Sequence, residues 1–177
     1  MTLRPAAFAL ALAIALGANA LGGCARPETQ QAAITPVEIT AGTACELDGM
    51  LLADYPGPKA QIHYADSDRP AFFCDTVELF STLLAGEQVR AVRAVYVQDM
   101  GQADWNEPKG HWIDARTASY VLGSKREGSM GPTIASFANR TDADAFAKEY
   151  GGRVLGFADI KPDMVDLRGG ALHDSQM

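Results

Sequence analysis

The chain has 177 residues, a formal net charge of −7 at neutral pH and 47% hydrophobic residues. This length suits one domain or two small halves, and it excludes a large multidomain enzyme. The acidic balance disfavours binding to nucleic acid and to anionic lipid headgroups, so we expect no nucleic-acid partner.

The N-terminal region has the pattern of a bacterial secretory signal. Arg4 precedes an apolar run over residues 6–21, and Leu21-Gly22-Gly23 stands directly before Cys24. A charged start, a short hydrophobic segment and small residues before the cleavage point are typical of exported proteins. The run is too short and too interrupted to span a bilayer, which needs about 20 apolar residues. We therefore predict that residues 1–23 are a signal peptide and that Cys24 becomes lipidated, which anchors the protein in a membrane.

Both ends of the remaining chain lack hydrophobic periodicity. Residues 24–43 are rich in Pro, Gln, Ala and Thr, and this composition predicts a flexible, lipidated tether. Residues 162–177 contain Gly169-Gly170 and few large apolar side chains, which predicts a loose C-terminal tail.

A first β-β-α-β unit is predicted within residues 44–101. Its strands and helix are expected, in chain order, at Ala60–Tyr64, Ala71–Cys74, Asp75–Gly86 and Val92–Val97. Asp75 is the expected helix cap, with Glu78 three residues later, and Gly86 is the expected helix stop.

A second unit of the same order is predicted within residues 102–161. Its elements are expected at Ala118–Leu122, Thr133–Phe137, Thr141–Tyr150 and Val154–Phe157. Thr141 is the expected cap of the helix, and Gly151-Gly152 end it. The sequence therefore predicts an α+β fold of two related β-β-α-β units with antiparallel strand pairing.

Sulfur-containing side chains are the main chemical signal. Cys45 and Met50 lie five positions apart ahead of the first strand, and Met130 lies in a Gly- and Pro-containing loop between two strands of the second unit. Thiolate and thioether ligands favour Cu(I), whereas zinc sites rarely use methionine. Because equivalent loops of a duplicated fold can face one another, we predict a Cu(I) site formed by Cys45, Met50 and Met130. An ordinary packing role for each methionine is the alternative.

Histidine also binds copper, and the chain contains three histidines. His111 lies in a loop before Trp112 and is a secondary candidate ligand. His63 lies in an alternating strand, where a packed or surface role is expected. His173 and Met177 lie in the predicted tail, where they could sample copper without defining a site.

Cys74 leaves three interpretations open. It could be a small buried thiol, or it could form a disulfide with Cys45 in an oxidising compartment. Its place at a helix N-terminus could also lower the pKa of the Cys74 thiol and make it nucleophilic. In that case Cys74 could form a hydrolase triad with His111 and Asp114. No oxyanion motif accompanies these residues, so we do not expect an enzyme.

A series of short motifs follows the predicted lipidation site. They are Cys45-x4-Met50, Tyr55-Pro56-Gly57-Pro58-Lys59-Ala60-Gln61, Phe73-Cys74-Asp75-Thr76, Val97-Gln98-Asp99-Met100, Trp112-Ile113-Asp114-Ala115-Arg116 and Gly128-Ser129-Met130-Gly131-Pro132-Thr133. In this order they closely resemble the NosL family of nitrous-oxide-reductase accessory lipoproteins, over residues 45–164.

The resemblance implies a Cu(I)-binding chaperone of the bacterial cell envelope that is lipid-anchored and faces the periplasm. It implies that copper passes to apo nitrous oxide reductase through a membrane-bound ABC-type maturation complex. The family's sulfur ligands fall on Cys45, Met50 and Met130. Many members have a second Cys where this chain has Asp48, so two thiolates within the first loop are not expected. The alternative function is a non-metal docking or scaffold lipoprotein with a Cys45–Cys74 disulfide.

Overall fold

The computed structural model describes residues 33–87, 89–165 and 167. The predicted signal peptide, Cys24, His173 and Met177 lie outside these residues. Within the described part of the chain, no helix has the length and apolar character needed to cross a membrane.

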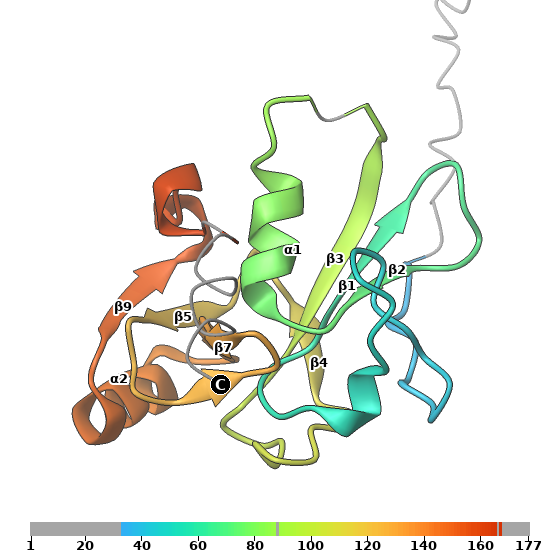
Figure 1. The fold of residues 1–177 in the computed structure, drawn as a ribbon. Helices are drawn as coiled ribbons and strands as arrows, with labels where there is room; N and C mark the ends of the chain where they lie inside the picture. Colours follow the sequence, from blue (N-terminus) through green and yellow to red (C-terminus); the bar gives the residue numbers. More distant parts are fainter. Residues whose placement is uncertain (1–32, 88, 166, 168–177) are drawn as a thin grey trace, which may run out of the picture. The chain divides into compact units, whose positions relative to one another are not determined.

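The elements follow one another in two successive groups (Figure 1). The first group is η1 (Leu52–Asp54), β1 (Ala60–Tyr64), β2 (Ala71–Phe73), α1 (Thr76–Leu83), β3 (Val92–Gln98) and β4 (Trp112–Asp114). The second group is β5 (Ser119–Leu122), β6 (Glu127–Gly128), β7 (Gly131–Pro132), β8 (Ala135–Phe137), α2 (Arg140–Tyr150), β9 (Arg153–Gly156), η2 (Phe157–Asp159) and η3 (Pro162–Met164).

Strand β1 is central in the first sheet. It pairs antiparallel with β2, where Ala60 faces Phe73, and with β3, where Ala60 faces Val97. The short strand β4 joins the outer side of β3, which gives the order β2-β1-β3-β4. All residues of β1 are buried, and α1 packs against β1 and β2. β4 was not among the predicted elements, because it belongs to neither of the two β-β-α-β patterns.

Strand β5 has the equivalent place in the second sheet. The order β8-β5-β9 is again antiparallel, and α2 packs against all three strands (Figure 1). Each unit therefore runs strand, strand, helix, strand, with its first strand in the centre. This arrangement confirms the predicted α+β fold of two related β-β-α-β units. The small hairpin β6–β7 is an insertion between β5 and β8 that the sequence did not predict.

The two helix starts differ in how well they were predicted. Asp75 caps α1 as expected, because its Oδ1 accepts a hydrogen bond from the Val77 N–H over 2.8 Å. The prediction that Thr141 caps α2 was wrong. The cap is Asn139, whose Oδ1 accepts from the Asp142 N–H over 3.0 Å. Asparagine is a strong N-cap residue, and its use two positions earlier places Thr141 inside the first helical turn.

One hydrophobic core joins the two units. It contains Ile62 and Val95 of the first sheet together with Tyr120 and Ile134 of the second half. The Phe80 ring of α1 packs edge-on against the Tyr120 ring, with centroids 5.0 Å apart. The two sheets therefore share apolar burial, which is the main stabilising contribution to such a fold.

Parts of the predicted tether and tail contact this body. The Val37 backbone exchanges two hydrogen bonds with the Gln61 side chain, over 2.8 and 3.0 Å. Ile39 packs against the Cys45 loop. At the other end, Val165 follows η3 and is buried in the main core.

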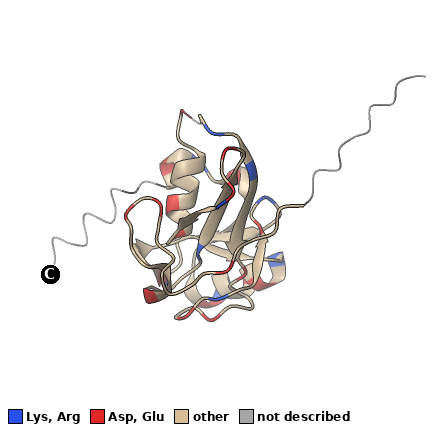
Figure 2. Cartoon of the chain, turned by 90° about the vertical axis from the view of Figure 1, so that its right-hand side faces the viewer, with Lys and Arg blue, Asp and Glu red and all other residues tan. Residues whose placement is uncertain are grey.

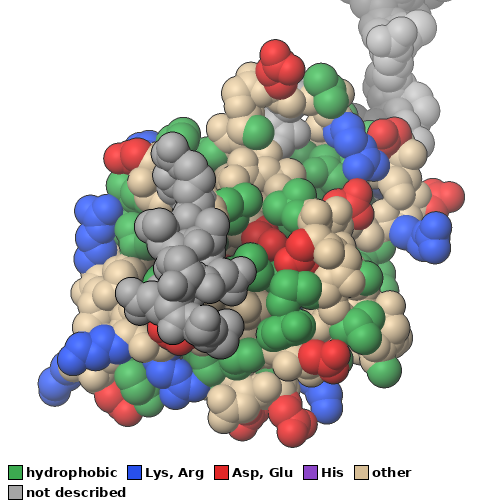
Figure 3. Space-filling view, viewed as in Figure 1, with side chains coloured by type: hydrophobic (Ala, Val, Ile, Leu, Met, Phe, Trp, Pro, Cys, Tyr) green, Lys and Arg blue, Asp and Glu red, His purple; other side chains and the backbone are tan. Residues whose placement is uncertain are grey.

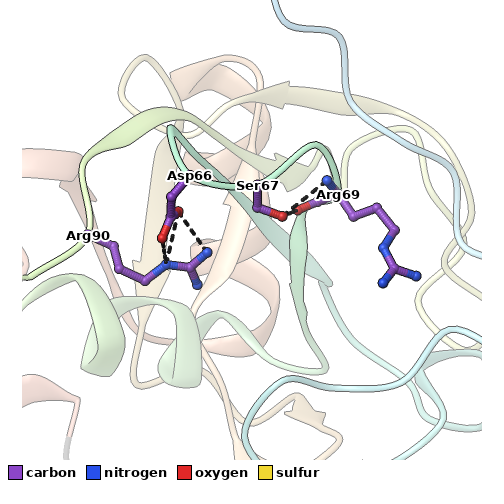
Figure 4. A network of polar contacts seen from close by, with 4 residues as sticks. All are labelled: Asp66, Ser67, Arg69 and Arg90. Atoms are coloured by element: carbon purple, nitrogen blue, oxygen red, sulfur yellow. Dashed lines mark hydrogen bonds and ion pairs between the residues drawn. The ribbon is translucent and has the colours of Figure 1, made fainter.

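Acidic and basic residues are spread over loops, helices and strands (Figure 2). One ordered polar network closes the β1–β2 turn (Figure 4). The Arg90 guanidinium donates to both carboxylate oxygens of Asp66, over 2.9 to 3.2 Å, and the Ser67 hydroxyl donates to the Arg69 carbonyl over 2.7 Å. The network lies at the opposite end of β1 from Phe73 and involves exposed groups, so we assign it a modest structural role.

Candidate metal centre

Two thiols and a carboxylate from three separate segments meet beside the end of β2. Cys45 comes from the loop before η1, Cys74 directly follows β2, and Glu78 lies in the first turn of α1. Both thiols donate to the same atom, Glu78 Oε2, over 3.1 Å from Cys45 and 3.2 Å from Cys74. Asp48 completes the group, and one ligand atom of each of the four residues lies within 4.8 Å of the others.

A tight hairpin presents Cys45 to this group. The Cys45 N–H donates to the Met50 carbonyl over 2.8 Å, and the Gly49 N–H donates back to the Cys45 carbonyl over 3.1 Å. Gly49 has a φ of 76°, in the left-handed region that favours glycine. The Glu46 N–H binds the Phe72 carbonyl over 2.7 Å. This last bond holds the loop against β2, two positions before Cys74.

The start of α1 supplies two further potential metal ligands, Cys74 and Glu78. Cys74 precedes the N-cap residue Asp75, and Glu78 lies three residues after that cap. In a capping box a glutamate at this position reaches back to the cap backbone. Here Oε2 of Glu78 accepts from both thiols. The positive end of the helix dipole favours negative charge at this position, so it also favours a nearby thiolate.

Three members of the group are buried, and only Asp48 is exposed to solvent. The Cys74 side chain is 0% exposed, Glu78 3% and Cys45 5%, whereas Asp48 is exposed. Acidic side chains lie near the centre of the face shown in Figure 3, with hydrophobic side chains around them. An ion would therefore reach the thiols most directly from the side of Asp48.

The two thiols bias each other's protonation in opposite directions. A hydrogen bond from Cys74 lowers the pKa of Cys45, because it stabilises the Cys45 thiolate. The same bond raises the pKa of Cys74, and burial raises it further. Cys45 is therefore the thiol of the pair that loses its proton more readily, and the Cys74 thiol would then donate to Cys45 instead of to Glu78. Thiolate is the metal-binding form of cysteine.

Lys59 is fully buried next to this pair. Its Nζ donates to the Pro56 carbonyl over 2.8 Å and to the Cys74 carbonyl over 3.0 Å. Burial lowers the pKa of Lys59 to about 8, while the negative charge of Asp75 opposes that change. Burial likewise raises the pKa of Asp75 to about 7. Oδ2 of Asp75 has no hydrogen-bond partner among the described residues.

The structure also brings both predicted methionine segments toward the thiols. The hydrogen bond from the Cys45 N–H to the Met50 carbonyl places these two residues opposite each other in the hairpin. Met130 lies in the β6–β7 turn and is 38% exposed. It lines a cavity of about 190 Å³ together with Glu78 and Met164.

The two histidines among the described residues, His63 and His111, lie elsewhere. His111 is exposed and precedes β4, whereas Cys74 follows β2, and these strands are the two edges of the sheet. Three interstrand spacings, roughly 14 Å, separate the two edges. Asp114 lies on β4 as well, so Cys74, His111 and Asp114 form no triad. His63 is buried in β1.

We did not assign Cys74 and Glu78 to the metal site from the sequence. One signal for them was present, namely a Cys and a Glu four positions apart at the start of a predicted helix. Asp48 was noted only as the replacement of a second Cys. In the structure the second thiol comes from Cys74 instead, through the fold of the chain.

Comparisons with known proteins agree with this architecture. The model of the NosL family matches residues 36–165. The copper-binding lipoprotein NosL of Stutzerimonas stutzeri is 37% identical over 170 residues, which cover 93% of this chain and 87% of that protein. The copper-binding lipoprotein NosL of Achromobacter cycloclastes is 40% identical over 136 residues, which cover 75% and 70% of the two chains. The crystal structure of the copper chaperone NosL from Shewanella denitrificans matches with a TM-score of 0.68 at 42% identity, over 71% of this chain and 94% of that chain.

Proposed function

The chain belongs to the NosL family, and from this premise we propose that it is a copper-binding lipoprotein that holds Cu(I) at Cys45 and Cys74. The observation that carries the proposal is the convergence of both thiols on Oε2 of Glu78, which directs two soft sulfur donors to one point. Paired thiolates suit Cu(I), and binding would release the thiol protons.

Met50 and Met130 complete the proposed site as exchangeable ligands. Thioethers need no deprotonation, so they can bind copper over a wide pH range. Met130 is partly exposed, and its hairpin contacts Cys74 through Ser129. A ligand in this position can release the ion to an incoming donor of a partner protein. This arrangement supports a carrier of copper and not an enzyme.

The proposed setting is the bacterial cell envelope. Lipidation of Cys24 would anchor the protein on the periplasmic side of a membrane, and the two curated relatives are lipoproteins. The copper would go to apo nitrous oxide reductase through a membrane-bound ABC-type maturation complex. The family resemblance supports this destination.

An anaerobic Cu(I) competition titration of the mature lipoprotein in detergent tests the site. We expect a single site that is lost in Cys45→Ser and in Cys74→Ser and weakened in Met50→Leu and in Met130→Leu. His111→Ala is the matched control, because His111 lies at the far edge of the sheet. Failure to compete with a moderate Cu(I) chelator, together with no free thiols in protein isolated without reductant, would support the scaffold alternative.

A transfer assay tests the destination. Copper-loaded protein is mixed with membranes that contain the maturation complex and with apo nitrous oxide reductase, and copper in the reductase is measured. We expect transfer from the parent protein and little transfer from Cys45→Ser. Equal transfer from free Cu(I) at the same concentration would count against a delivery role.

A further inference from the structure

Lys59 carries a buried positive charge that no contact neutralises. Its side chain is 0% exposed, and both hydrogen bonds of its Nζ go to backbone carbonyls, those of Pro56 and Cys74. None of the ion pairs among the described residues includes Lys59. The acidic groups whose ionised forms act on it electrostatically are Asp75, Cys74, Glu78 and Cys45.

Hydrogen bonding alone does not require a charge at this position. The Cys74 carbonyl already accepts a hydrogen bond from the neutral Ser129 hydroxyl over 2.5 Å. Burying an ammonium group is costly, and lysine is rarely fully buried without a charged partner. The charge itself therefore needs a function.

The thiol site has a selectivity problem that a fixed positive charge can solve. Two thiols flanked by the carboxylates of Glu78 and Asp48 form a donor set that divalent ions such as Zn(II) also accept. When a monovalent and a divalent ion displace the same number of thiol protons, the monovalent complex is more negative by one charge unit. A neighbouring cation stabilises the more negative complex.

We propose that Lys59 is a specificity-determining residue that favours Cu(I) over divalent ions at the Cys45–Cys74 site. It acts through its charge and touches the backbone of Cys74, not the metal. Its two carbonyl acceptors hold the ammonium in a fixed position beside the thiols. This inference rests on the proposed copper-binding function.

The test measures two dissociation constants of the mature lipoprotein in detergent at pH 7, one for Cu(I) under anaerobic conditions and one for Zn(II). The ratio of the two constants is the preference for Cu(I). The variants are Lys59→Gln, which keeps a neutral donor, and Lys59→Leu. We expect the preference for Cu(I) over Zn(II) to fall roughly tenfold in both, which is the order of effect of one neighbouring unit charge in a partly buried site. Lys109→Gln is the matched control, because it removes the charge of an exposed lysine in the loop before β4, at the opposite edge of the sheet from β2.

An unchanged preference in the Lys59 variants, or an equal change in Lys109→Gln, would overturn the inference. The proposed function is tested separately, because it fails only if the parent protein itself does not bind Cu(I). If neither Lys59 variant folds, Asp75→Asn is measured instead. This change keeps a side-chain oxygen for the α1 cap and removes a carboxyl group that, with a pKa of about 7, carries part of a negative charge at pH 7, so the preference for Cu(I) must increase. A decrease or no change would contradict the role of the local charge.

Discussion

Ser129 donates a hydrogen bond from its hydroxyl to the backbone carbonyl of Cys74 over 2.5 Å, across 55 positions of the chain. This bond fastens the β6–β7 hairpin beside the thiol pair. The same hairpin makes a very close backbone approach at Gly128, where a Cβ would lie 2.2 Å from Asp75 Oδ2 and 2.9 Å from the Thr133 Cβ. The position of Met130 therefore depends on this approach.

The first prediction concerns Gly128→Ala. The added methyl group must push the hairpin away from Asp75, and we expect a loss of unfolding free energy of about 1–3 kcal/mol, as for other overpacked sites. Cu(I) affinity should fall with it, because Met130 moves away. Denaturant unfolding and chelator competition measure the two effects. Gly86→Ala is the control, since nothing lies within 4 Å of a Cβ there. Equal stability of the two variants would show that the hairpin is not tightly docked.

The second prediction concerns the turn that presents Cys45. Gly49 has a φ of 76° and open space around a Cβ, so Gly49→Ala introduces backbone strain without a clash. We expect a cost of about 1–2 kcal/mol in unfolding free energy and weaker Cu(I) binding. Gly42→Ala, in the same segment and with open space, should change neither quantity by a comparable amount. Thermal unfolding and competition titration give the comparison, and a stable Gly49→Ala protein of parental affinity would contradict it.

The third prediction concerns the thiol that the sequence analysis did not assign to copper. Cys74→Ser should reduce Cu(I) affinity by more than the roughly 10–100-fold that loss of an outer-shell partner costs. X-ray absorption should show fewer sulfur ligands around copper than in the parent protein. If Cys74→Ser binds copper like the parent, the site depends on Cys45 and the methionines alone.

The fourth prediction concerns oxidation. Cys45 and Cys74 are both free thiols and their sulfur atoms lie within 4.8 Å of each other. Treatment of the apo protein with diamide should oxidise them to one intramolecular disulfide while the diamide is reduced. The oxidised protein should lose Cu(I) binding and regain it after reduction. Thiol counting and mass spectrometry of peptides follow the reaction. Retention of two reactive thiols after treatment would argue that the pair is held apart.

The fifth prediction concerns pH. Burial, together with the charge of Arg93, lowers the pKa of His63 below its ordinary value of 6.5. The folded protein then binds fewer protons at this site than the unfolded chain, so the contribution to stability is present above pH 6.5 and is lost as the pH falls toward the lowered value. Unfolding of His63→Gln should depend less on pH in this window. A histidine NMR titration measures the pKa directly, and a value above 6.5 would contradict the burial argument.

Much of the fold could be predicted because its signals are local. The β1, β3 and α1 segments carry their own alternation, apolar face and cap, and they were placed within a few residues. The cap of α2 was misplaced, because Asn139 and Thr141 are both suitable cap residues and only the contacts of the folded helix choose between them. β4 and the β6–β7 hairpin lie outside the β-β-α-β pattern, and the strands of the hairpin have only two residues each, which is too few to show a period.

The sequence by itself determined the order of the two β-β-α-β units and the supply of soft donors, because helix periodicity, strand alternation and residue chemistry are properties of neighbouring positions. Only the tertiary structure decided which donors meet. Cys45 reaches Cys74 because its loop binds back onto β2 at Phe72, and His111 is kept away because β2 and β4 are opposite edges of one sheet. Lys59 is buried beside the thiols because it directly precedes β1, and β1 pairs with β2 so that Ala60 faces Phe73. Strand pairing joins residues that are distant in the chain, and no local pattern specifies those pairs.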